Sequence, residues 1–174
     1  PAIRLYHDNV LAKQAGCGRT PWHFDDQHFP LDTNDVVTAW IPAQPTPVEM
    51  GPLSFAYPLE VHKLVNAVKF EKAGVGYDRG VSEVFAKNDV TINETPFELG
   101  EVSFHHNLNF HTASQNRTNR SRVVLANTYY KDGARVINSP TMISGDWQKF
   151  MPNVKPGDLA ASPLNPICWP VDDE

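Results

Sequence analysis

Cysteines and long apolar runs are scarce in this chain of 174 residues, and each scarcity excludes a class of protein. The two cysteines, Cys17 and Cys168, lie far apart and fit no zinc-binding spacing, which excludes a cysteine zinc site and favours a reducing, cytoplasmic location. The longest nearly apolar run, residues 36–43, is far shorter than the roughly 20 residues that cross a bilayer. Residues 1–10 lack the uninterrupted apolar stretch of a signal peptide. We therefore expect no membrane segment and no export signal.

Basic charge is also scarce. The formal net charge is -5, and the one basic cluster consists of Arg117, Arg120 and Arg122. A surface that binds nucleic acid normally carries a continuous basic stripe, whereas a short arginine cluster suits a small anion at least as well. We predict a small-molecule partner and neither a nucleic-acid nor a membrane partner, and the sequence is silent about the oligomeric state.

Proline and glycine, by contrast, are frequent: fifteen prolines and ten glycines interrupt the chain at short intervals. This punctuation limits helices and favours short strands joined by turns. One helix is predicted over residues 81–87, and residues 61–70 fit both a strand and a helix. Local β-branched and aromatic content predicts strands over residues 2–7, 22–29, 36–41, 53–57, 90–92, 101–110 and 122–130. The predicted fold class is therefore mainly β.

The length corresponds to about one domain, and neither an internal repeat nor a second domain is visible. We therefore expect a single domain over residues 1–174. Prolines and glycines dominate the last part of the chain, so residues 136–174 are expected to form a C-terminal segment that either covers the domain or trails as a loose end.

The stretch PWHFDDQHF, residues 21–29, concentrates side chains that bind metals. Side chains alternate along a strand, so His23 and Asp25 would share one face while Asp26 and His28 would share the other. Each pair has the spacing that lets an imidazole nitrogen and a carboxylate oxygen reach one cation. Spacing alone does not choose between the pairs, and an isolated pair of this kind is most often a weak surface ion pair.

A third ligand has to come from elsewhere in the chain. Along residues 101–111 an apolar face alternates with a polar face that carries His105, Asn107 and His111. We interpret His105 and Asn107 as part of a solvated stripe, whereas His111 closes the strand beside a turn rich in small polar residues. Two histidines and one carboxylate on one side of an ion leave positions open for substrate and dioxygen on Fe(II).

These pieces together resemble the phytanoyl-CoA dioxygenase family of Fe(II)- and 2-oxoglutarate-dependent oxygenases, over roughly residues 1–135. By position, the resemblance assigns the metal ligands to His23, Asp25 and His111, and the arginine that binds the co-substrate to Arg122. The matching motifs are WHFD at 22–25, VVTAWIP at 36–42, MGPL at 50–53, GEVSFHH at 100–106 and HTASQNRTNRSR at 111–122.

The resemblance also implies a fold and a reaction. The fold is a double-stranded β-helix, a cupin-like jelly roll with a few peripheral helices. The reaction consumes 2-oxoglutarate and O2 at Fe(II), releases succinate and carbon dioxide, and hydroxylates a small organic substrate. Arg122 suits the far carboxylate of 2-oxoglutarate because a guanidinium binds it through two parallel hydrogen bonds and stays charged. Trp40 is expected either to pack in the core or to line the co-substrate pocket.

Two departures from the family bear on this interpretation. The family usually has His-Gly-Ser where this chain has His111-Thr112-Ala113, so the contact made by that serine is absent or moves to Thr112 or Ser114. The chain is also short at its N-terminus, and elements that flank the barrel in relatives are expected to be missing.

Two other functions stay open at this point. A cupin-like metal-dependent isomerase or hydrolase would use the same three ligands on zinc or manganese and would not need Arg122. A catalytically silent β-sandwich binding module is consistent with the short N-terminus and with Ala113.

Overall fold

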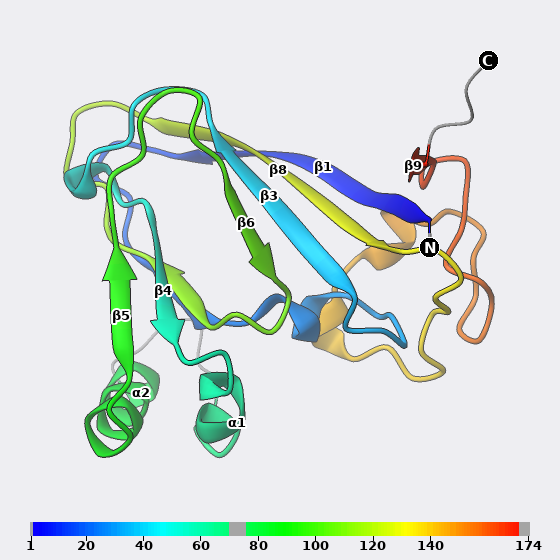
Figure 1. Ribbon diagram of the computed structural model, residues 1–174, viewed down its shortest axis with the longest axis horizontal. Helices are drawn as coiled ribbons and strands as arrows, with labels where there is room; N and C mark the ends of the chain where they lie inside the picture. Colours follow the sequence, from blue (N-terminus) through cyan, green and yellow to red (C-terminus); the bar gives the residue numbers. More distant parts are fainter. Residues whose placement is uncertain (1, 70–75, 171–174) are drawn as a thin grey trace.

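Two antiparallel sheets form the body of the computed structural model, which describes residues 2–69 and 76–170 (Figure 1). The larger sheet has the strand order β6-β3-β8-β1-β9 and the smaller sheet the order β2-β7-β4-β5. The larger sheet consists of β1 (Ile3–Lys13), β3 (Val36–Pro42), β6 (Ser103–His106), β8 (Arg122–Lys131) and β9 (Ile167–Trp169). The smaller sheet consists of β2 (Thr20–His23), β4 (Leu53–Tyr57), β5 (Thr91–Glu94) and β7 (His111–Ala113). The predicted mainly β jelly roll is confirmed.

Two short helices lie together beyond one end of β4 and β5 (Figure 1). They are α1 (Val61–Val65) and α2 (Gly76–Lys87), so the predicted helix over residues 81–87 is confirmed and begins earlier. The ambiguous segment 61–70 starts as a helix, and its last residue lies outside the described part. No helix in that part is both long and apolar enough to cross a membrane. The single-turn 3-10 helices are η1 (Asp25–His28), η2 (Val48–Met50), η3 (Met142–Ser144) and η4 (Trp147–Lys149).

Two of the predicted strands are too long, and both errors touch the predicted site. The strand expected over residues 22–29 ends at His23, because the chain turns into η1 directly after Phe24. The strand expected over residues 101–110 ends at His106, where the Asn109 N–H donates to the His106 carbonyl (2.9 Å) and closes a turn. Alternation along one long strand therefore explains neither segment.

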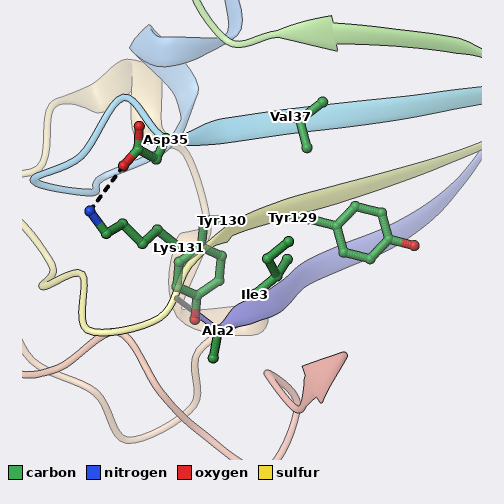
Figure 2. Close-up of a pocket in the computed structure, with 7 residues that line it drawn as sticks. All are labelled: Ala2, Ile3, Asp35, Val37, Tyr129, Tyr130 and Lys131. Carbon is green, nitrogen blue, oxygen red and sulfur yellow. Dashed lines mark ion pairs between the residues drawn. The ribbon is translucent and has the colours of Figure 1, made fainter. Parts of the chain in front are cut away.

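The two faces of the larger sheet are both rich in apolar residues. Arg122 on β8 and its register partner Lys13 on β1 face the smaller sheet, whereas Leu125 and its partner Val10 face away from it. Phe104 also lies on the outer face and is 72% exposed. Figure 2 shows Ile3, Val37 and Tyr129 around a shallow hollow on this outer face, where Lys131 forms an ion pair with Asp35 (3.2 Å). Alternation therefore does not reveal from sequence which face points inward.

The C-terminal segment covers one end of the larger sheet. Trp147, Met151 and Ala160 pack with Tyr6 and Tyr130 in a buried cluster. The Tyr130 hydroxyl donates to the Ala160 carbonyl, and β9 pairs with the start of β1. These contacts place parts of the segment 136–170 against β1 and β8.

Candidate metal centre and anion pocket

Three side chains from three different elements meet between the two sheets. His23 is the last residue of β2 and His111 the first of β7, and the two are register partners in the smaller sheet. Their side chains therefore lie on the same side of that sheet, with ring centroids 4.2 Å apart. Asp25 begins η1, and the turn at Phe24 brings its carboxylate back toward both rings.

The donor atoms of these residues converge on one point. The Asp25 Oδ1 lies 3.6 Å from the His23 Nε2 and 3.8 Å from the His111 Nε2, and one ligand atom from each residue falls within 4.8 Å of the others. Both Nδ1 atoms are 2.8 Å from a backbone carbonyl, that of Pro21 for His23 and that of Asn109 for His111. Such a bond keeps the proton on Nδ1 and turns the Nε2 lone pair toward the carboxylate.

Burial sets the protonation states that metal ligands need. Removal from water lowers the pKa of His111 to about 3 and also lowers the pKa of His23. Burial acts to raise the pKa of Asp25, but the rings of His111, His105 and His23 outweigh it and hold that pKa well below its usual value. At neutral pH the site therefore offers neutral imidazoles and an ionised carboxylate.

A fourth ring, that of His105 on β6, belongs to this site and was wrongly interpreted from sequence as solvated. His105 is 6% exposed, and its Nε2 lies 3.6 Å from the Asp25 Oδ2, the oxygen that faces away from His23. The Thr38 hydroxyl donates to the same oxygen (3.4 Å) and lies 3.0 Å from the Thr128 hydroxyl. The larger sheet thus holds one oxygen of Asp25 and leaves the other to the two histidines. The same correction applies to Asn107, which is buried.

A cavity of about 260 Å³ is lined by His23, Asp25 and His111 as well as by Arg122. The Arg122 guanidinium is 5% exposed, lies over the Trp40 ring (5.2 Å to its centroid) and donates from Nη1 to the Gly51 carbonyl. Its Nε is buried and has no hydrogen-bond partner in the described part of the chain. Trp40 both packs in the core and lines the cavity, so the two expectations for it are compatible. Leu53, Ala113 and Ala126 form the apolar wall around the guanidinium.

The structure brings five of the six predicted site residues to this cavity: His23, Asp25, Trp40, His111 and Arg122. Thr112 does not line it. Thr112 points to the other side of β7, and its hydroxyl donates to the Thr20 carbonyl.

The alternative candidates also lie away from the centre of the cavity. Asp26 accepts a hydrogen bond from the Asn107 Nδ2 (3.1 Å), and His28 is exposed at the cavity rim, with its Nδ1 3.1 Å from the Ile143 carbonyl. Arg117 and Arg120 are exposed on the loop that precedes β8. Of the three arginines in the basic cluster, Arg122 is thus the one that reaches the cavity.

The residues present fit a divalent transition metal. Two neutral imidazoles and one carboxylate on one side of a point are the donor set of non-haem Fe(II) sites with open positions. The Asp25 Oδ1 lies near both Nε2 atoms, 3.6 Å from one and 3.8 Å from the other, which suits ligands that share one ion. The buried cation of Arg122 at the other end of the cavity suits a carboxylate.

The fold and the site define a class: a double-stranded β-helix protein with two histidines and one carboxylate placed as a candidate metal site. The model of the phytanoyl-CoA dioxygenase (PhyH) family matches residues 2–124. The chain therefore belongs to the phytanoyl-CoA dioxygenase family. No curated protein matches the chain by sequence.

Solved structures share this fold. The carbocyclase SnoK from nogalamycin biosynthesis, described as non-heme and alpha ketoglutarate dependent, superposes with a TM-score of 0.73 at 24% identity, over 95% of this chain and 62% of its own. The epimerase SnoN, in complex with Fe3+, alpha ketoglutarate and nogalamycin RO, gives 0.70 at 23% identity, over 95% and 65%. The non-heme monooxygenase ThoJ gives 0.57 at 18% identity, over 81% and 50%. The chain thus spans less than two thirds of the length of these structures.

Proposed function

We propose that this chain is the catalytic domain of an Fe(II)- and 2-oxoglutarate-dependent dioxygenase that hydroxylates a small organic substrate in the cytoplasm, with succinate and carbon dioxide as co-products. One observation carries the proposal: a two-histidine, one-carboxylate donor set shares one cavity with a buried guanidinium that has no carboxylate partner among residues 2–69 and 76–170. A metal-dependent isomerase or hydrolase would need the first of these features but not the second. The relatives named above support a 2-oxoglutarate-dependent enzyme in this fold.

Each residue has a defined role in this proposal. His23, Asp25 and His111 would hold the iron and leave one side of it open. Arg122 would bind the far carboxylate of 2-oxoglutarate, and Trp40 would form the wall along it. When bound, iron and 2-oxoglutarate together with O2 supply an oxidant strong enough to hydroxylate a carbon–hydrogen bond.

The cavity also has the asymmetry that the reaction requires. Its arginine end is walled by apolar side chains, which strengthens the pairing of a guanidinium with a carboxylate by excluding water. Farther from Arg122 along the strands, where His7 is the register partner of Thr128, β1 and η1 contribute the polar groups His7 and His28 to the lining. We assign the arginine end to the co-substrate and the polar end to the primary substrate.

The test compares two adjacent carboxylates. Protein mixed anaerobically with Fe(II) and 2-oxoglutarate should develop a weak visible charge-transfer band, and air should then produce succinate. Asp25→Ala should lose both signals because it removes a metal ligand, whereas Asp26→Ala should retain them because Asp26 bonds to Asn107 outside the donor set. Absence of both signals from the unaltered protein, or their loss from Asp26→Ala alone, would refute the proposal.

A further inference from the structure

A second buried cation, Lys13, accompanies Arg122 at the arginine end of the cavity. Lys13 is the last residue of β1 and the register partner of Arg122 on β8, so both side chains enter the space between the sheets. Lys13 is 7% exposed and Arg122 is 5% exposed. Among residues 2–69 and 76–170, neither forms an ion pair with a carboxylate. Two buried positive charges without a counter-ion are costly, and a bound anion would offset that cost.

The Lys13 ammonium bridges the two sheets at this point. It donates to the carbonyl of Ala113 (3.1 Å), the last residue of β7, and to the carbonyl of Ser114 (2.6 Å), the residue that follows. Ala113 lines the cavity, so Lys13 holds one wall of the pocket in place from behind. Lys13 itself does not line the cavity, and it therefore acts through its charge and through the backbone that it holds.

Gly51 connects this lysine to Arg122. The Gly51 carbonyl accepts the Arg122 Nη1 hydrogen bond, and a Cβ at Gly51 would stand 2.2 Å from the Ser114 carbonyl oxygen. The left-handed φ of +73° and this close approach both require glycine. The Ser114 carbonyl thus contacts both the Gly51 backbone and the Lys13 ammonium, and a shift of Lys13 would reach Arg122 through three contacts.

We propose that Lys13 is a positioning residue of the co-substrate site: it fixes the end of β7 beside Gly51 and adds a second positive charge to the pocket that receives the far carboxylate. This inference rests on the proposed function, because it takes 2-oxoglutarate as the anion. It predicts that affinity for the co-substrate depends on the charge of Lys13, whereas affinity for the metal does not.

Titration of Lys13 should make the affinity for 2-oxoglutarate depend on pH, which a purely structural role would not do. Burial, together with the charge of Arg122, lowers the pKa of Lys13 to about 8. The other titratable groups around it are Cys17, which follows β1, and Glu94 on β5, whose carboxylate accepts the Ser114 hydroxyl (2.7 Å). Affinity for 2-oxoglutarate should therefore fall as the pH rises through about 8, by up to about tenfold per pH unit if one proton is lost.

The experiment measures the dissociation constant of 2-oxoglutarate from the anaerobic Fe(II)-loaded protein between pH 7 and pH 9.5. Lys13→Met should weaken binding about tenfold at pH 7 and flatten the profile, because the charge is gone. Lys13→Arg keeps the charge across this range and should retain affinity with a flat profile. A Cys17→Ser background removes the thiol as a source of pH dependence, and Arg122→Gln provides the reference for loss of the primary anion partner. Metal affinity, measured by Fe(II) titration, should be unchanged in both Lys13 variants.

The outcomes separate the two proposals. Unaltered protein that binds no 2-oxoglutarate would overturn the proposed function, and this inference with it. Unaltered protein that binds the co-substrate, alongside Lys13→Met with the same affinity and the same pH profile, would overturn the inference alone. If Lys13→Met does not fold, Lys13→Arg is compared with the unaltered protein. An affinity for 2-oxoglutarate that falls equally in both proteins above pH 8 would refute the role of Lys13.

Discussion

His105 offers a direct test of how the site is held together. Its Nε2 lies 3.6 Å from the Asp25 Oδ2, and Thr38 donates to the same oxygen, so the larger sheet restrains the half of the carboxylate that faces away from His23 and His111. Replacement by phenylalanine keeps an aromatic ring in the buried space, one atom larger than imidazole, and removes both nitrogens. Asp25 would then be free to rotate and to turn its second oxygen toward the metal.

The size of the effect follows from the position of His105 behind a ligand. Loss of a group that orients a metal ligand typically costs tenfold to hundredfold in metal affinity, which is about 1.4 to 2.8 kcal/mol. We expect His105→Phe to lie in this range, because Thr38 remains as the second partner of the same oxygen. Loss of His111 should be far more severe, since it removes a ligand.

The assay is an anaerobic Fe(II) titration, with the charge-transfer band of the 2-oxoglutarate complex as a second readout. His106→Phe is the matched control, because His106 is the next residue of β6 and faces the outer side of the sheet. His105→Phe should weaken Fe(II) binding and shift the band, whereas the control should do neither. Equal metal affinity and an unshifted band in the two variants would show that His105 does not orient Asp25.

Two further predictions concern stability. Because burial lowers the pKa of His111 to about 3, the metal-free protein should become less stable as the pH falls below 6.5, where the unfolded chain takes up a proton that the folded chain excludes. At pH 5.5 this histidine should lower the free energy of unfolding, measured with urea, by about 1.4 kcal/mol. An identical dependence of that free energy on pH in His111→Asn would contradict the assignment. Gly51→Ala should lower the free energy of unfolding by about 2 to 4 kcal/mol, because its Cβ meets the Ser114 carbonyl. Gly133→Ala, at a φ of +90° with no atom within 4 Å, should lower it by only about 1 kcal/mol. Equal losses in the two variants would exclude the clash.

The expected reason for the proximity of His23 and Asp25 differs from the one that the structure shows. Alternation along a strand left the pairs His23/Asp25 and Asp26/His28 equivalent, and the family resemblance chose the first. In the structure the strand ends at His23, and η1 returns Asp25 toward the rings. The i, i+2 spacing therefore brings the two ligands together through a bend in the backbone, which residue periodicity does not encode.

His105 shows a second limit. The alternation of apolar and polar residues along β6 was recognised, but the polar face was assigned to solvent. The structure reverses this: Phe104 faces outward and His105 faces the cavity. A site that binds a metal and a dicarboxylate needs polar groups inside, so the usual rule of apolar residues inward fails where the function lies. Alternation along residues 101–111 puts His105 and His111 on one face, but β6 ends at His106, so the fold and not the alternation brings the two ring centroids to within 5.0 Å.

The sequence by itself determined the donor chemistry and the strand-rich fold, because these depend on residue type and short-range spacing. The choice of Arg122 among the three arginines came from the family resemblance. Tertiary structure alone decided which sheet face encloses the cavity, that Thr112 points away from it, and that Lys13 stands opposite Arg122. Those features depend on the register between strands far apart in the chain, where a shift of one residue reverses every side chain.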